Sequence, residues 1–173
     1  MSLENLKRAI RDVPDFPKPG IIFKDITPLI SDGKLFREAI DLMAKPYLAH
    51  PPAKVVCIDA RGFIFGAALA HKLGAGVVPV RKAGKLPHRT KRASFDLEYG
   101  SATVEIHEDG VSPGERVLIV DDLLATGGTL RAAIDLVRHA QGEIIGVSVA
   151  IELDFLKGRE KIRDLPVHSL IHY

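Results

Sequence analysis

Thirteen consecutive residues decide the fold: Val117-Leu118-Ile119-Val120-Asp121-Asp122-Leu123-Leu124-Ala125-Thr126-Gly127-Gly128-Thr129. The apolar run 117–120 predicts a fully buried central strand. A short polar loop follows, and then apolar residues recur at helical spacing on one face: Leu130, Ala133, Ile134 and Val137. Strand, tight loop and helix in this order are typical of an α/β fold.

The loop between strand and helix is suited to binding phosphate. A helix N-terminus leaves N–H groups unpaired and carries partial positive charge. Gly127 and Gly128 let the backbone approach an anion closely, and Ala125 keeps the loop small. Thr126 and Thr129 add hydroxyl donors. The loop lacks the Gly-Lys-Ser/Thr of a Walker A motif and the Gly-x-Gly-x-x-Gly of a dinucleotide turn.

Two adjacent carboxylates, Asp121 and Asp122, precede this loop. A simple phosphate site does not favour acids beside the anion, whereas a sugar phosphate does, because carboxylates accept hydrogen bonds from vicinal hydroxyls. The stretch therefore predicts a ribose-5-phosphate site. The plain alternative is an ordinary strand-to-helix turn with an Asp pair near the helix start.

Composition indicates one globular domain, residues 1–173. The net charge is +2, which provides no bulk attraction to nucleic acid. The single cysteine, Cys57, excludes a disulfide framework and favours a reducing compartment. The chain has no signal-peptide pattern and no apolar run long enough to span a bilayer. We therefore expect a cytoplasmic protein that binds neither nucleic acid nor membrane.

Hydrophobic periodicity predicts the remaining elements. Leu3, Leu6, Ile10 and Val13 predict a helix that ends at Pro14, and the proline-rich segment 15–28 predicts an irregular pocket wall or a packed N-terminal arm. The other expected helices span 34–48, 63–73 and 130–141, the strands 54–58, 76–80, 143–151 and 167–171, and a hairpin 94–98 with 102–106. This alternation indicates a doubly wound, mainly parallel sheet, with sites at the carboxyl ends of strands.

Two further segments carry cations. Arg61 follows a predicted strand and could grip an anion with two hydrogen bonds, although a surface salt bridge is the commoner role for such an arginine. Residues 81–92 are rich in cations and free of acids. This run could form a nucleic-acid or membrane patch, or a loop over a small, highly anionic substrate. The near-neutral chain favours the second possibility.

The stretch 117–129 resembles the phosphoribosyl-pyrophosphate motif of type I phosphoribosyltransferases. Its Leu-Leu-Ala-Thr-Gly-Gly-Thr variant, the Phe-Pro-Lys-Pro-Gly segment at 16–20 and the Leu-Glu-Tyr-Gly segment at 97–100 are similar to those of the adenine phosphoribosyltransferases. The resemblance covers nearly the whole chain. It implies transfer of 5-phosphoribose from its 1-diphosphate to adenine, giving AMP and diphosphate in purine salvage.

The resemblance also implies roles for single residues. An N-terminal hood, about 1–33, would bind the purine near Ile22 and Lys24, largely through backbone groups. A flexible flap, about 81–106, would present Glu98 and Tyr99, with Glu98 acting at the purine imidazole. Diphosphate would meet Arg61, Arg81, Lys82 and Lys85, and ribose 5-phosphate would meet Asp121, Asp122, Ala125, Thr126, Gly127, Gly128 and Thr129.

Mg²⁺ would be held mainly by substrate oxygens, because the sequence shows no dedicated ligand set and no metal-ligand spacing of histidines. A homodimer is expected, in which the cation matching Arg81 can reach the partner's site. Two other functions stay open on the residues alone: a non-enzymatic purine or phosphoribosyl sensor, and a transferase for another purine base.

Overall fold

The computed structural model describes residues 3–96 and 101–173. The chain forms two compact units, residues 1–42 and residues 43–173. The first unit contains α1 (Leu3–Arg8), β1 (Arg11–Pro14), β2 (Ile22–Asp25), α2 (Thr27–Ser31) and most of α3 (Gly33–Ala44).

A two-stranded antiparallel hairpin, β1 with β2, organises the first unit. Two cross-strand ion pairs hold it: Lys24 Nζ lies 2.6 Å from Asp12 Oδ1, and Arg11 Nη2 lies 3.0 Å from Asp25 Oδ2. The predicted helix from Leu3 to Val13 is therefore wrong beyond Arg8. Residues 11–14 instead pair with β2, from Arg11 opposite Asp25 to Pro14 opposite Ile22. Helical spacing of apolar residues does not reveal such pairing with another strand.

The segment 15–28 is also more regular than predicted, because it contains β2 and the start of α2. Pro28 lies in the first turn of α2, where its missing N–H is not needed. Asp32 caps α3 as expected: its Oδ1 accepts hydrogen bonds from the N–H groups of Lys34, at 2.8 Å, and Leu35, at 3.1 Å. The helix ends at Ala44, and a 3₁₀ turn that includes Pro46 follows.

The second unit is built on a seven-stranded sheet among the described residues, with strand order β5-β6-β4-β3-β7-β8-β9. Neighbours from β4 to β9 run parallel, whereas β6 is antiparallel to both β4 and β5. The strands are β3 (Lys54–Ile58), β4 (Gly76–Lys82), β5 (Thr90–Asp96), β6 (Ser101–His107), β7 (Arg116–Leu124), β8 (Glu143–Glu152) and β9 (Val167–His172).

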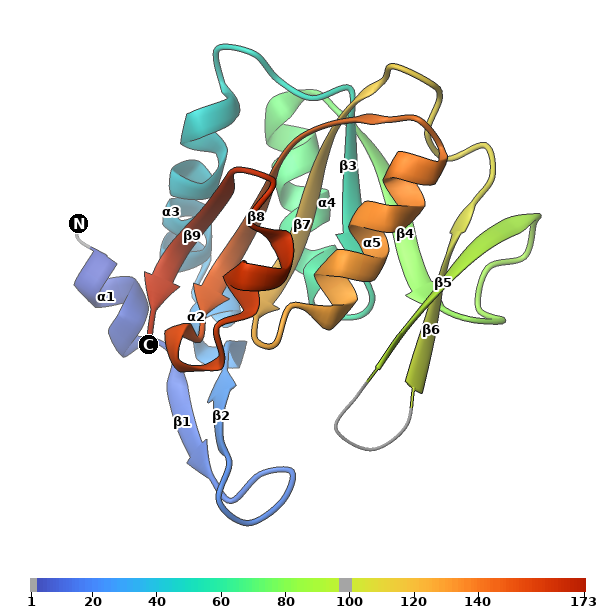
Figure 1. The fold of residues 1–173 in the computed structure, drawn as a ribbon. Coiled ribbons are helices and arrows are strands. Elements are labelled where there is room, and N and C mark those ends of the chain that lie inside the picture. The colour runs from blue at the N-terminus through green and yellow to red at the C-terminus, as the bar shows by residue number, and fades with distance from the viewer. Residues whose placement is uncertain (1–2, 97–100) are drawn as a thin grey trace. The chain divides into compact units, whose positions relative to one another are not determined.

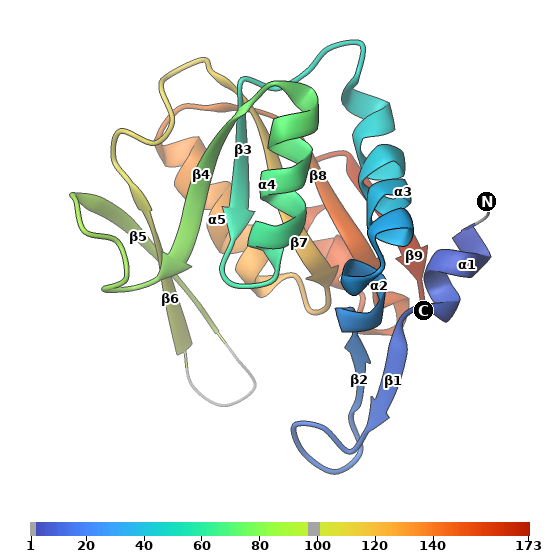
Figure 2. The ribbon, with the colours of Figure 1, turned by 180° about the vertical axis from the view of Figure 1, so that it is seen from behind.

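Helices α4 (Gly62–Leu73) and α5 (Gly128–His139) cover opposite faces of this sheet (Figures 1 and 2). Strand β7 lies at the centre, between β3 and β8, and residues 117–120 have no exposed surface. The prediction of a doubly wound, mainly parallel sheet around this strand is confirmed. The expected hairpin is also present and is longer than predicted, since β5 pairs with β6 from Thr90 opposite His107 to Asp96 opposite Ser101.

The segment after β8 forms two short 3₁₀ helices, η2 (Asp154–Leu156) and η3 (Gly158–Ile162). Within the described residues, the helices are too short or too polar to cross a bilayer.

The close approach of α4 to β3 gives a stability test. A methyl group added at Gly66 would lie 2.3 Å from Cβ of Cys57, which cannot move away because it is part of the central sheet. We expect Gly66→Ala to lower the free energy of unfolding by about 1–3 kcal/mol, measured by urea denaturation.

Gly33→Ala is the matched control, because a methyl group there meets nothing within 4 Å and the residue begins a helix. It should leave the free energy of unfolding unchanged or raise it by up to about 1 kcal/mol. Equal stability of Gly66→Ala and the wild type would contradict the packing of α4 on Cys57.

Candidate active site at the carboxyl end of β7

The loop that joins β7 to α5 encloses a hollow. Gly127 has a left-handed backbone, with φ of 79°, and turns the chain into α5. As a glycine it offers no side-chain cap, so the N–H groups of the first turn of α5 are left for an anion. The hollow is lined by Asp121, Leu123, Ala125, Thr126, Gly127, Gly128, Thr129 and Leu130. The structure thus brings the predicted phosphate-loop residues together around one space.

Asp121 and Asp122 lie near the carboxyl end of β7, and Asp121 lines this hollow. Asp121 Oδ1 accepts a hydrogen bond of 2.8 Å from the N–H of Asp122. The Asp122 side chain is 8% exposed, and Arg61 Nε lies 2.9 Å from its Oδ2. That oxygen is buried and accepts no well-formed hydrogen bond from the described residues, so its contact with Arg61 is an ion pair.

Burial sets the charge of this pair. Burial, reinforced by the charge of Asp122, raises the pKa of Asp121 well above its usual range. Burial also raises the pKa of Asp122, against the opposing effect of Arg61. A pair of this kind resists carrying two negative charges until a cationic group or several hydroxyl donors approach it.

Arg61 immediately precedes α4, in the loop after β3. Its guanidinium is paired with Asp122, and its expected contact with diphosphate stays a prediction. The commoner role considered for it, a salt bridge, is present, but with a buried acid of the candidate site. Because the Arg61 side chain is 34% exposed, it can face both this carboxylate and a ligand.

Arg81, at the end of β4, is held within its own chain. Its Nε donates to Asp59 Oδ2 at 2.9 Å, and its Nη1 donates to the carbonyl of Lys85 at 3.2 Å. Lys82 and Lys85 are exposed. The run 81–92 was expected to be mobile through charge repulsion, but residues 84–86 are fixed by hydrogen bonds to an acid from outside the run.

That acid is Glu105, which the sequence analysis did not identify. Its side chain lies on β6, is 1% exposed, and accepts hydrogen bonds from three successive backbone N–H groups. Burial alone would raise the pKa of Glu105, but the hydrogen bonds from the Leu86 N–H, Thr90, Arg92 and the Gly84 N–H outweigh it and lower the pKa. No local pattern marks Glu105, because its donors come from residues 84–92 and meet it only in the folded chain.

A second buried acid, Glu152 at the end of β8, binds Arg159, the neighbour of the residue that packs against the phosphate loop. Arg159 donates to both of its carboxylate oxygens, at 2.9 and 2.5 Å, and Ser169 donates to one of them. These bonds outweigh burial and lower the pKa of Glu152. Arg159 thereby fixes the neighbouring Gly158, where an added methyl group would lie 2.1 Å from the carbonyl oxygen of Ala125. The loop backbone is thus packed directly on η3.

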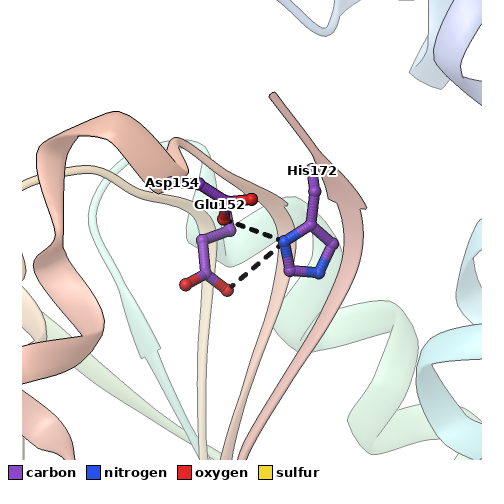
Figure 3. A group of neighbouring side chains, drawn as sticks. All are labelled: Glu152, Asp154 and His172. Atoms are coloured by element: carbon purple, nitrogen blue, oxygen red, sulfur yellow. Dashed lines mark hydrogen bonds and ion pairs between the residues drawn. The ribbon is translucent and has the colours of Figure 1, made fainter.

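Glu152 also belongs to a group with Asp154 and His172 at the carboxyl ends of β8 and β9 (Figure 3). Their possible ligand atoms lie within 4.8 Å of one another. His172 Nδ1 is 2.9 Å from Asp154 Oδ1 and 3.9 Å from Glu152 Oε2. Because Glu152 already accepts bonds from Arg159 and Ser169, we interpret the group as an ion-pair network.

The predicted base-binding residues lie in the first unit. Ile22 begins β2 and is 58% exposed. The Lys24 ammonium is paired with Asp12, at 2.6 Å. Phe23 packs edge-on against Phe16, with ring centroids 5.2 Å apart. Glu98 and Tyr99 lie outside the described residues.

The comparisons with known proteins agree with this geometry. A family model for the phosphoribosyl transferase domain matches residues 30–170. A protein of Acidobacterium capsulatum named adenine phosphoribosyltransferase is 58% identical over 173 residues, which cover 100% of this chain and 96% of the relative.

Solved structures give the same result. A crystal structure of adenine phosphoribosyltransferase from Rhodothermus marinus matches with a TM-score of 0.95 and 52% identity, covering 99% of this chain and 98% of that one. The Saccharomyces cerevisiae enzyme, complexed with an imino-altritol bisphosphate and adenine, matches with a TM-score of 0.92 and 40% identity, covering 97% of each chain. Neither the sensor nor another purine base finds support among these proteins. The chain therefore belongs to the phosphoribosyltransferase family and, within it, to the adenine phosphoribosyltransferases.

Proposed function

We propose that the protein transfers the 5-phosphoribosyl group from 5-phosphoribosyl 1-diphosphate to N9 of adenine, releasing AMP and diphosphate. One observation carries this proposal. The first turn of α5 and the Asp121 carboxylate line a single hollow, and Asp122, the next residue of β7, is buried against Arg61, so the site offers N–H donors to a phosphate and acceptors to sugar hydroxyls. The yeast relative has been crystallised with adenine and a bisphosphate, which is consistent with two such ligands.

The acids would act at the sugar. As the bond between ribose C1 and the diphosphate oxygen breaks, its electron pair leaves with diphosphate and the ring gains positive charge. Asp121 and Asp122 accept hydrogen bonds from the ribose hydroxyls and lie near this charge. Their unfavourable burial is relieved as the ring becomes cationic, so the interaction strengthens toward the transition state.

Cations would act at the leaving group. Arg61, Arg81, Lys82 and Lys85 are the groups we assign to diphosphate, with Arg61 and Arg81 released in part from their acidic partners. The side chains at the phosphate loop suit a metal held mainly through substrate oxygens, since Asp121 and Asp122 are already engaged with neighbouring groups. When bound, Mg²⁺ would neutralise charge on the diphosphate.

The base would be read by the first unit. Backbone groups near Ile22 and Lys24 can offer a carbonyl to the exocyclic amine and an N–H to N1, while the Lys24 side chain stays with Asp12. Residues 1–33 would form the hood and 81–106 the flap of one catalytic domain. Glu98 would hydrogen-bond N7 and help to remove the N9 proton, and Tyr99 would lie beside it.

We also propose that the enzyme is a cytoplasmic homodimer that binds neither nucleic acid nor membrane. A single, buried cysteine suits a reducing compartment, and burial raises its pKa to about 12, which keeps the thiol unreactive. The homodimer rests on the resemblance to the adenine phosphoribosyltransferases.

Base competition tests the function directly. Isotope-labelled adenine, the diphosphate donor and Mg²⁺ should give labelled AMP. Hypoxanthine inverts both edge partners, and each unpaired buried polar group costs about 1–3 kcal/mol. We therefore expect kcat/KM for adenine to exceed that for hypoxanthine by about 10²- to 10⁴-fold. Use of hypoxanthine or guanine within a few-fold of adenine would refute the assignment.

Lys24→Ala separates backbone readout from side-chain readout. It should keep most of the preference for adenine, because the ammonium is already paired with Asp12. A collapse of selectivity in this variant alone would leave adenine as the substrate and reject backbone recognition.

Asp122→Asn tests the sugar site. It removes the charge that faces both Arg61 and the developing cation, so turnover should fall about 10²-fold, measured in single-turnover kinetics with saturating donor. Asp109→Asn removes an exposed acid of the same type and should leave turnover unchanged. Near-native turnover of Asp122→Asn would remove this residue from the mechanism.

Gly158→Ala tests the support of the phosphate loop. Its methyl group would displace the carbonyl of Ala125 or the N–H of Gly127, which lie 2.1 and 2.9 Å away. We expect the affinity for AMP to fall about 10-fold or more by calorimetry, because the displaced groups carry the phosphate cradle. Gly33→Ala is the matched comparison, since its methyl group meets nothing within 4 Å and its backbone is not left-handed, so AMP affinity should stay unchanged. Unchanged AMP affinity in Gly158→Ala would mean that η3 does not support the loop.

A further inference from the structure

Glu105 is almost fully buried inside the most cationic part of the chain. Its Oε1 accepts hydrogen bonds from the N–H groups of Gly84, Lys85 and Leu86, at 2.9, 3.0 and 3.0 Å. Its Oε2 accepts from Thr90 Oγ1, at 3.2 Å, and from Arg92 Nε, at 3.1 Å. One carboxylate therefore accepts five hydrogen bonds. One of them comes from Arg92, which pairs with Glu105 across the hairpin, and the other four come from residues 84–86 and Thr90.

Both backbone polar groups of Lys85 form hydrogen bonds with charged side chains. Its N–H donates to Glu105, and its carbonyl accepts a hydrogen bond of 3.2 Å from Arg81 Nη1. Arg81 is itself anchored on Asp59, next to the Arg61 loop. With its backbone fixed at both ends, the exposed Lys85 side chain leaves the loop in a defined direction.

The charge of Glu105 matters as much as its shape. Three N–H groups that converge on one point form an anion-binding nest, which a negatively charged oxygen fills far better than a neutral one. A nest without its anion would leave three dipoles facing one another in a site shielded from water. The loop 84–86 would then relax to another conformation.

We infer that Glu105 is a positioning residue for the diphosphate end of the donor, acting through Lys85. This inference rests on the proposed function, because it assumes that Lys85 binds the diphosphate. Strand β6 would then have a second role besides forming the flap, because its Glu105 fixes the backbone of residues 84–86.

The competing explanation is that Glu105 only stabilises the fold. The two explanations can be tested separately, because the two oxygens of Glu105 contact different segments. Oε1 holds the loop, whereas Oε2 holds Arg92 within the hairpin. Arg92→Gln therefore weakens the same carboxylate's ion pair without removing a loop contact. Its side chain is 60% exposed, so the fold should tolerate the change.

The test compares Glu105→Gln with Arg92→Gln in steady-state kinetics, with thermal melting as a check of folding. Glu105→Gln should lower kcat/KM for the diphosphate donor about 10- to 100-fold, mainly through KM, while the KM for adenine changes less than twofold. Arg92→Gln should leave both KM values within about twofold of the wild type. Equal donor effects in both variants, or a donor KM in Glu105→Gln within twofold of the wild type, would overturn the inference.

A double-mutant cycle with Lys85→Ala tests the route through Lys85. Glu105→Gln should have little further effect on the donor KM once the Lys85 ammonium is gone. Additive effects would show that Glu105 acts elsewhere, and would overturn the inference. If Glu105→Gln does not fold, Glu105→Asp takes its place, because it keeps the charge but draws the oxygen back from the nest. An inactive wild type would instead refute the proposed function.

Discussion

The removal of water from Asp121 and Asp122 is the constraint on which the rest of the structure depends. A strand buried between β3 and β8 is expected to be apolar, yet this one carries two adjacent acids near its carboxyl end. Burial raises the pKa of both, and an isolated buried carboxylate is costly. Arg61 therefore has to lie beside Asp122, which fixes the turn from β3 into α4. The central acids thus determine where the neighbouring loop carries its cation.

The sequence revealed the parts of the molecule that depend on local pattern. Local patterns were enough to predict three parts of the second unit. A continuous apolar run marked the strand at 117–120, small and hydroxyl residues marked the loop 125–129, and alternating apolar residues marked the hairpin of β5 with β6. The N-terminal strand β1 was missed, because its helical spacing of apolar residues conceals a partner in β2. Local pattern is a weak guide where pairing across the chain decides the structure.

The supporting acids could not be predicted for a different reason. Glu105 and Glu152 lie in strands where an acid is ordinarily solvated. Their burial follows from donors that reach them from other segments: residues 84–86 for Glu105, and Arg159 with Ser169 for Glu152. Such an acid becomes recognisable only when the tertiary fold places its donors, since a buried charge needs all of them together.

Four acid–arginine pairs among the described residues of the second unit divide into two kinds by what else they contact. Glu105 and Glu152 accept further hydrogen bonds from backbone or hydroxyl groups, so Arg92 and Arg159 are secondary partners in filled networks. Arg61 and Arg81 instead lie against Asp122 and Asp59, with 34% and 36% of their own side chains exposed. These two guanidinium groups are therefore held by ion pairs while part of each stays in contact with solvent. Arg81 in addition donates to the carbonyl of Lys85, so it fixes the loop as well as pairing with Asp59. The second unit thus uses acid–arginine pairs both to complete buried networks and to hold partly exposed cations near the carboxyl ends of β3 and β4.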